Sequence, residues 1–97
     1  MARVVYSANA LTNLERAFDF LAAQDPDAAA GSAHAIQSAV ELLAQHPLIG
    51  RIVTADLREL VISFGRTGYV ALYRYLPVSD EVRVLAIRHQ RELDYSP

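Results

Sequence analysis

Three residue types are missing from the chain altogether: cysteine, lysine and tryptophan. It has no cysteine, so disulfide bonds and thiol chemistry are excluded, and a reducing compartment such as the cytoplasm fits this composition. It also has no lysine, so all nine basic residues are arginine, and against eleven acidic residues they give a net charge of −2. A protein that holds nucleic acid through many phosphate contacts usually carries a strong basic excess. That excess is lacking here.

Long apolar runs are also absent. No stretch approaches the ~20 residues needed to span a bilayer, and no charged start followed by an apolar segment marks a secretion signal. Hydrophobic residues make up 53% of the chain and charged residues 21%, so intrinsic disorder is not expected. The length of 97 residues predicts one domain over residues 1–97, with a thin core, in the cytoplasm and without a membrane partner.

No pattern of metal ligands or cofactor contacts is present. The three histidines are scattered, and without cysteine they lack the spacing of a metal site. No nucleophile elbow and no glycine-rich phosphate loop can be found. The sequence therefore predicts no metal and no cofactor.

The first half of the chain predicts a strand and a helical hairpin. Residues 3–6 form a short β-branched and aromatic run, and Ser7 is placed to cap a helix over about 8–24. The expected apolar face of that helix is Leu11, Leu14, Phe18 and Leu21, with Asn13, Glu15, Arg16 and Asp19 turned elsewhere.

Asp25-Pro26 ends this helix and starts a second one, because proline suits the first helical position. The second helix is expected to run for about 20 residues, until His46-Pro47 stops it. Its apolar stripe is Ala29, Ala33, Ile36, Val40 and Leu43, widened by Leu42.

After Gly50 the hydrophobic period changes to that of strands. Three β-rich runs, Leu57 to Phe64, Tyr69 to Leu76 and Val82 to Arg88, are separated by turn segments 65–68 and 77–80. They predict an antiparallel meander, which the N-terminal strand can join. The predicted fold is α+β with the order β-α-α-β-β-β, a helical hairpin packed on a mainly antiparallel four-stranded sheet.

Both faces of the predicted sheet are apolar. In the last run, for example, Leu85 and Ile87 oppose Val82, Val84 and Ala86. One helical hairpin can cover only one face, so either a partner chain shelters part of the other face or its tyrosines and small residues tolerate exposure.

Four segments, in order along the chain, carry a resemblance to a known family. They are His46-Pro47-Leu48-Ile49-Gly50-Arg51, Leu57-Arg58-Glu59-Leu60, Gly68-Tyr69-Val70-Ala71-Leu72-Tyr73-Arg74, and the run from Val84 to Glu92 that closes at Tyr95. With the predicted element order, they resemble the RelE/ParE superfamily of type II toxins, and the ParE type more than the RelE type. The resemblance implies a cytoplasmic toxin neutralised by an antitoxin, ParD-like or other, encoded beside it. The antitoxin's C-terminal segment would cross the helical hairpin and sheet, and a homodimer within a toxin–antitoxin hetero-oligomer is a further option.

The resemblance leaves two activities open. RelE-type members cut mRNA on the ribosome, whereas ParE-type members inhibit DNA gyrase without a chemical step of their own. In the RelE-type nucleases, lysines before the central Gly-Tyr and an arginine just after it supply the cations. Here Val61, Ser63 and Val70 stand at those positions.

The prediction is accordingly a gyrase inhibitor without catalytic residues. A ribosome-dependent ribonuclease is the alternative, with His89, Arg91 and Tyr95 as its candidate catalytic residues and Glu92 as a possible companion of His89. A third reading is an inactive member that only binds a partner.

Two sets of candidate binding residues follow. Target binding is predicted for Arg58, Arg66, Arg88, His89, Arg91 and Tyr95, each with solvated surface charge or a local hydrogen bond as the alternative. Antitoxin binding is predicted for Leu14, Phe18 and Leu21 on the first helix and for Tyr69, Tyr73 and Tyr75 on one strand face, where cross-strand packing explains the tyrosines equally well. Arg74 is expected in a structural ion pair.

Overall fold

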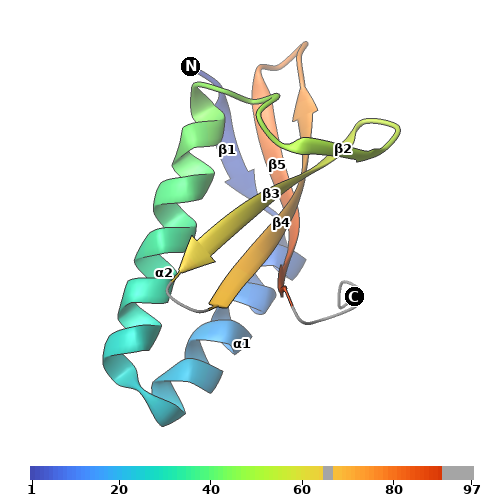
Figure 1. Cartoon of the computed structure of the whole chain (residues 1–97). Helices are drawn as coiled ribbons and strands as arrows, with labels where there is room; N and C mark the ends of the chain where they lie inside the picture. The colour runs from blue at the N-terminus through green and yellow to red at the C-terminus, as the bar shows by residue number, and fades with distance from the viewer. Residues whose placement is uncertain (65–66, 91–97) are drawn as a thin grey trace.

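In the computed structural model, which describes residues 1–64 and 67–90, two helices cover one face of a five-stranded sheet (Figure 1). The elements are β1 (Arg3–Tyr6), α1 (Ala8–Gln24), α2 (Pro26–Glu41), the 3₁₀ turn η1 (Leu42–Ala44), β2 (Arg51–Thr54), β3 (Leu57–Phe64), β4 (Thr67–Leu76) and β5 (Glu81–His89). The predicted α+β class, the helical hairpin and the antiparallel meander are confirmed.

The strand count differs from the prediction. The sheet has the order β1-β5-β4-β3-β2, with β1 parallel to β5 and every other pair antiparallel. The additional strand is β2, whose four residues precede a two-residue turn in which Ala55 adopts a φ of 45°. Such a left-handed residue suits a tight hairpin turn, but alanine there gives no signal that a sequence reader would recognise.

The helix boundaries follow from their caps. The Ser7 hydroxyl accepts a hydrogen bond from the Ala10 N–H at 3.0 Å, and the Asp25 carboxylate accepts one from the Ala28 N–H at 3.2 Å. α1 therefore matches the prediction of 8–24. α2 is shorter than the expected 20 residues, because the chain tightens into a 3₁₀ turn after Glu41 and reaches Pro47 through that turn.

The face that α1 turns to the sheet is not the one predicted. Ala10 and Asn13 are its buried residues, whereas Leu11 is 52% exposed and Phe18 is 43% exposed. Small side chains let the helix approach β5 closely, and the Asn13 Oδ1 accepts a hydrogen bond from the Ile87 N–H at 2.9 Å. Leu11 and Phe18 are left largely in solvent, whereas Leu14 and Leu21 pack against the core.

A β-bulge in β5 explains this contact and corrects a second prediction. Tyr73 pairs with Val84 and Leu72 with Ala86, so Leu85 is an extra residue without a partner on β4. Ile87 therefore shares the helix-covered face with Val84, and Ala86 lies on the other face, opposite to the strict alternation expected. The Leu85 carbonyl accepts hydrogen bonds from the Ser7 hydroxyl (3.0 Å) and the Asn9 side chain (3.2 Å), which ties the bulge to the start of α1.

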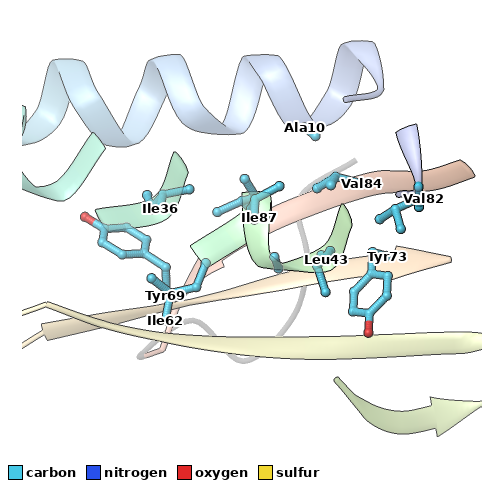
Figure 2. Close-up of a cluster of buried hydrophobic side chains, with 12 residues drawn as sticks. Ala10, Ile36, Leu43, Ile62, Tyr69, Tyr73, Val82, Val84 and Ile87 are labelled. Atoms are coloured by element: carbon cyan, nitrogen blue, oxygen red, sulfur yellow. The ribbon is translucent and has the colours of Figure 1, made fainter. Parts of the chain in front are cut away.

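The core lies between the helices and the sheet, and Tyr69 and Tyr73 sit within it (Figure 2). α2 and η1 contribute Ile36, Val40 and Leu43, which are 2%, 1% and 0% exposed. The Tyr73 hydroxyl donates to the Pro47 carbonyl and accepts from the Gly50 N–H, both at 2.8 Å. A Cβ on Gly50 would stand 2.6 Å from the Tyr73 ring, so glycine is required at this close approach.

Candidate partner-binding surfaces

A groove opens where the two helices diverge. They meet at Asp25 and spread apart toward β1 (Figure 1), and the space between α1, α2 and β1 has a volume of about 780 Å³. Its apolar lining is Val4 from β1, Leu11, Leu14, Ala17 and Phe18 from α1, and Ala29, Ala33, Ile36 and Val40 from α2. Leu11 and Phe18, two exposed apolar residues of α1, therefore lie on one concave surface, which we call the helical groove.

Two of the predicted antitoxin-binding residues, Leu14 and Phe18, line the helical groove. Leu21 packs against the core as a partly buried residue and does not line the groove. Sequence reasoning assigned Leu11 to the core, although it belongs to the groove. The signal that could have placed it is the pair of stripes on α1, in which Ala10, Asn13 and Ala17 alternate with Leu11, Leu14 and Phe18 at helical spacing.

The charged residues that line the helical groove, within the part of the chain that the structure describes, are both acidic. Glu15 comes from α1 and Glu41 from α2. Burial, reinforced by the negative charge of Glu41, raises the pKa of the Tyr6 hydroxyl, which also belongs to the lining. Tyr6 therefore stays protonated at neutral pH and can donate a hydrogen bond. Sequence reasoning singled out neither Glu15 nor Glu41, because each is isolated in the chain.

The three tyrosines of β4 lie on the helix-covered face. Tyr69 is 3% exposed and Tyr73 is 0% exposed, so their rings offer a partner no surface while the helices are in place. Cross-strand and core packing accounts for both. Tyr75 is half-buried, and its hydroxyl donates to the Asp80 carboxylate at 2.7 Å, which raises its pKa.

The opposite face of the sheet, which we call the open face, carries ion pairs. Near its centre the buried Glu59 carboxylate accepts two hydrogen bonds from Arg51, at 2.8 and 3.0 Å, and lies 3.9 Å from the Arg88 guanidinium. Arg74 forms the ion pair expected for it, at 2.9 Å from Asp56.

A second cluster occupies the β1–β5 edge. Glu81 is 4% exposed, and its two carboxylate oxygens accept hydrogen bonds from Arg3 at 2.6 Å and from Arg83 at 2.7 Å. These bonds from Arg3 and Arg83 hold the pKa of the Glu81 carboxyl below its ordinary value. Arginine side chains of the chain itself therefore occupy part of the face for which a sheltering partner chain was one of the two predictions.

The residues predicted to bind a target do not form one surface. The Arg58 guanidinium donates to the carbonyls of Leu48 (3.1 Å) and Gly50 (2.9 Å), so it anchors the segment before β2. Arg88 reaches toward Glu59 on the open face, whereas the His89 ring packs edge-to-face on Tyr69, with centroids 5.4 Å apart, on the covered face. Arg66, Arg91, Glu92 and Tyr95 lie outside the described residues.

The positions where a RelE-type nuclease carries cations are aliphatic or neutral and lie together. Val61 of β3 pairs directly with Val70 of β4, and Ser63 pairs with Gly68 one step along the same face. Val61 is 46% exposed and Val70 is 3% exposed. Across residues 1–64 and 67–90, no group of three histidine, aspartate or glutamate side chains is placed to hold a metal ion, and no helix is long and apolar enough to cross a bilayer.

Comparison with known proteins identifies the family. The model of the family described as "ParE toxin of type II toxin-antitoxin system, parDE" matches residues 4–94. The chain belongs to this toxin family. The protein is therefore the toxin of a type II toxin–antitoxin system, and toxins of this type pair with an antitoxin.

Relatives and a solved structure agree with this assignment. Toxin RelE3 of Caulobacter vibrioides is 43% identical over 82 residues, which are 84% of each chain, and Toxin RelE2 of the same organism is 37% identical over 93 residues, which are 96% of this chain and 100% of that one. A chain of the chromosomal ParDE system from P. aeruginosa superposes with a TM-score of 0.73 over 92% of this chain and 96% of that one, at 19% identity, and so has the same fold. The family model carries the ParE name and the Caulobacter relatives carry the RelE name, so membership establishes a type II toxin and does not name its target.

Proposed function

We propose that this toxin acts by binding DNA gyrase, that it cuts no RNA, and that an antitoxin encoded beside it neutralises it. The pairing of Val61 with Val70 on the open face carries the first part of the proposal. Ribonuclease chemistry requires a group that activates the 2′-hydroxyl and cations that stabilise the charge developing on the phosphate. Two valines at the centre of that surface can do neither.

The arginines near this pair support the same conclusion. Arg88, which pairs with Val70, lies 3.9 Å from the Glu59 carboxylate, and Arg51 is bound to the same carboxylate. Farther along β4, Arg74 is bound to Asp56. A cation already held by a carboxylate gains less from a phosphate, since the existing ion pair must first be broken. The net charge of −2 also opposes the approach of RNA.

The ribonuclease alternative would pair His89 with residues of the C-terminal segment. The His89 ring packs on Tyr69 at the helix-covered face, and Arg88 projects from the opposite face toward Glu59. Neighbouring strand residues point to opposite faces, so Arg88 cannot act with His89 on one phosphate without a change in the strand. The alternative therefore depends on Arg91, Glu92 and Tyr95, which lie outside the described residues.

The antitoxin is proposed to occupy the helical groove. A segment that lays an apolar face between two helices uses positions spaced by three or four residues, as the groove walls themselves do. Leu14 and Phe18 are the predicted contacts that the groove retains, and Leu11 joins them. Gyrase would then be bound elsewhere on the toxin or in competition with the antitoxin.

Two purified assays test the proposed target. Toxin at increasing concentration is added to gyrase in a supercoiling assay and to a reconstituted translation system in which mRNA cleavage is mapped. We expect inhibition of supercoiling and intact mRNA. Cleaved mRNA with normal supercoiling would refute the proposal in favour of the ribonuclease, and no effect in either assay would favour an inactive, partner-binding member.

Groove variants test the place of the antitoxin. Leu11→Asp with Phe18→Asp should leave toxicity in cells intact and abolish neutralisation by the co-expressed antitoxin, because two charges would have to be buried without partners. Phe20→Asp is the matched control: Phe20 lies on the same helix and is 67% exposed, but it does not line the groove. Equal neutralisation of both variants would remove the groove from the proposal.

A further inference from the structure

The helical groove is too large and too exposed to be a packing defect. Its volume of about 780 Å³ lies within the range of cavities that enclose a bound molecule. Leu11 and Phe18 on one wall leave about half of their side-chain surface in solvent, at 52% and 43%. An apolar occupant would remove this surface from water, which is the main favourable term in association.

The shape of the helical groove suits a helix. Its α2 wall runs from Ala29 to Glu41, a span of about 18 Å at 1.5 Å per residue, or roughly three helical turns. Both walls present side chains at intervals of three and four residues, and such ridges receive the ridges of a third helix. β1 closes the wide end with Val4 and Tyr6.

The charged residues of the groove indicate which charge the bound segment should carry. Among the residues that the structure describes, Glu15 on the α1 wall and Glu41 on the α2 wall are the charged lining residues, and no arginine or histidine lines the groove. Neither carboxylate makes an ion pair with a described residue. An acidic segment would be repelled from both walls, and a basic one would be attracted, so the two glutamates act on the choice of partner more than on the fold.

We infer that the helical groove selects an antitoxin helix with an apolar face flanked by arginine or lysine, and that Glu15 and Glu41 are the specificity-determining residues that receive those cations. The inference rests on the proposed pairing of the groove with an antitoxin and adds the chemistry of recognition. The Tyr6 hydroxyl, beside Glu41, supplies a hydrogen-bond donor at the wide end of the groove.

The test uses the full toxin and, as the probe, the protein encoded by the reading frame adjacent to the toxin gene. Its affinity is measured by titration calorimetry and its association rate by surface plasmon resonance, each at 50 mM and 500 mM NaCl. The test variant is Glu15→Gln with Glu41→Gln. The control is Asp19→Asn with Asp27→Asn, which removes one exposed carboxylate from each helix at positions that do not line the groove.

We expect the test variant to bind about tenfold more weakly at 50 mM NaCl, mainly through a slower association rate, and to lose most of its salt dependence. The control should behave as the unmodified toxin. If toxin and test variant bind the probe equally at both salt concentrations, the inference is overturned while the proposed pairing stands. If the unmodified toxin does not bind the probe at all, the proposed pairing itself fails, and the inference fails with it.

Charge-reversal variants of the toxin and of the probe test whether the two glutamates recognise the cations directly. Glu15→Lys with Glu41→Lys should abolish binding of the same probe and restore it for a probe whose arginine and lysine residues on the apolar helix's flanks are changed to glutamate. Restoration supports direct charge recognition. Failure of the reversed pair to bind, with both proteins folded by circular dichroism, would contradict it.

Discussion

The two faces of the sheet are built on different principles, although the sequence makes both of them apolar. The helix-covered face is closed by packing: Tyr73, Val82 and Val84 are fully buried beneath the helices. The open face carries ion pairs instead: Arg51 and Arg88 reach Glu59, and Arg3 and Arg83 reach Glu81. Val61 on this face stays 46% exposed. An apolar pattern in a strand therefore does not by itself indicate a missing partner.

Part of the exposed apolar surface of this toxin lies on its helices, beside exposed apolar residues before and on β2 and on β3. α1 buries its small residues and displays Leu11 and Phe18. The search for a partner site consequently moves from the sheet to the helical groove, where the apolar surface is concave and the charges have no partner among the described residues.

The largest difference in stability between the two faces is expected when two neighbouring residues of β3 are each replaced by alanine. Ile62 is 3% exposed on the covered face and Val61 is 46% exposed on the open face. Ile62→Ala should lower the free energy of unfolding by about 2–5 kcal/mol, because it leaves a cavity in the core. Val61→Ala should change it by about 0.5 kcal/mol or less. Urea denaturation followed by circular dichroism measures both, and equal losses would show that the faces do not differ as described.

The second comparison concerns two tyrosine hydroxyls of β4. Tyr73→Phe removes a buried hydroxyl that bonds to Pro47 and Gly50, so it should cost about 2 kcal/mol of stability. Tyr75→Phe removes an exposed bond to Asp80 and should cost about 0.5 kcal/mol or less. Thermal or urea unfolding of the two variants gives the answer. A Tyr73→Phe protein as stable as the unmodified toxin would mean that the segment before β2 is held by Arg58 alone.

The smallest effect on stability is expected for an ion pair of the open face, and this effect depends on pH. The pKa of Glu81 is lowered in the folded protein, so its ion pairs stabilise the fold above the ordinary glutamate pKa of 4.5, and this contribution is lost as the pH falls through the lowered value. The difference in urea midpoint between toxin and Glu81→Gln should therefore be present at pH 7 and shrink toward pH 3. A difference that stayed constant over this range would argue against the paired, ionised Glu81.

How far the sequence leads can be followed residue by residue. The helix starts were predictable because Ser7 and Asp25-Pro26 are strong capping signals, and β3, β4 and β5 were predictable from their apolar runs and the turns between them. The bulge at Leu85 was not predictable from the sequence. The residues around it are all apolar and do not show which of them face the helices: Val82, Val84, Leu85, Ala86 and Ile87. The position of the bulge depends on Ser7, Asn9 and Asn13, which lie more than 70 residues away in the chain.

The binding surfaces were predictable only in part. Leu14 and Phe18, which were predicted to bind the antitoxin, both line the helical groove, and their contact with an antitoxin stays a prediction. Glu15 and Glu41 escaped notice because they are 26 positions apart and meet the same groove only after α1 and α2 fold back on each other. Tyr69 and Tyr73 share a strand face with Tyr75, but the sequence alone could not tell which face the helices would cover.

An experiment in growing cells can show whether this toxin acts by binding gyrase or by cutting RNA. The toxin is expressed without its antitoxin, and incorporation of labelled thymidine and labelled methionine is followed together over the first minutes. We expect DNA synthesis to fall first and protein synthesis to fall only later. Loss of protein synthesis before any change in DNA synthesis would contradict it.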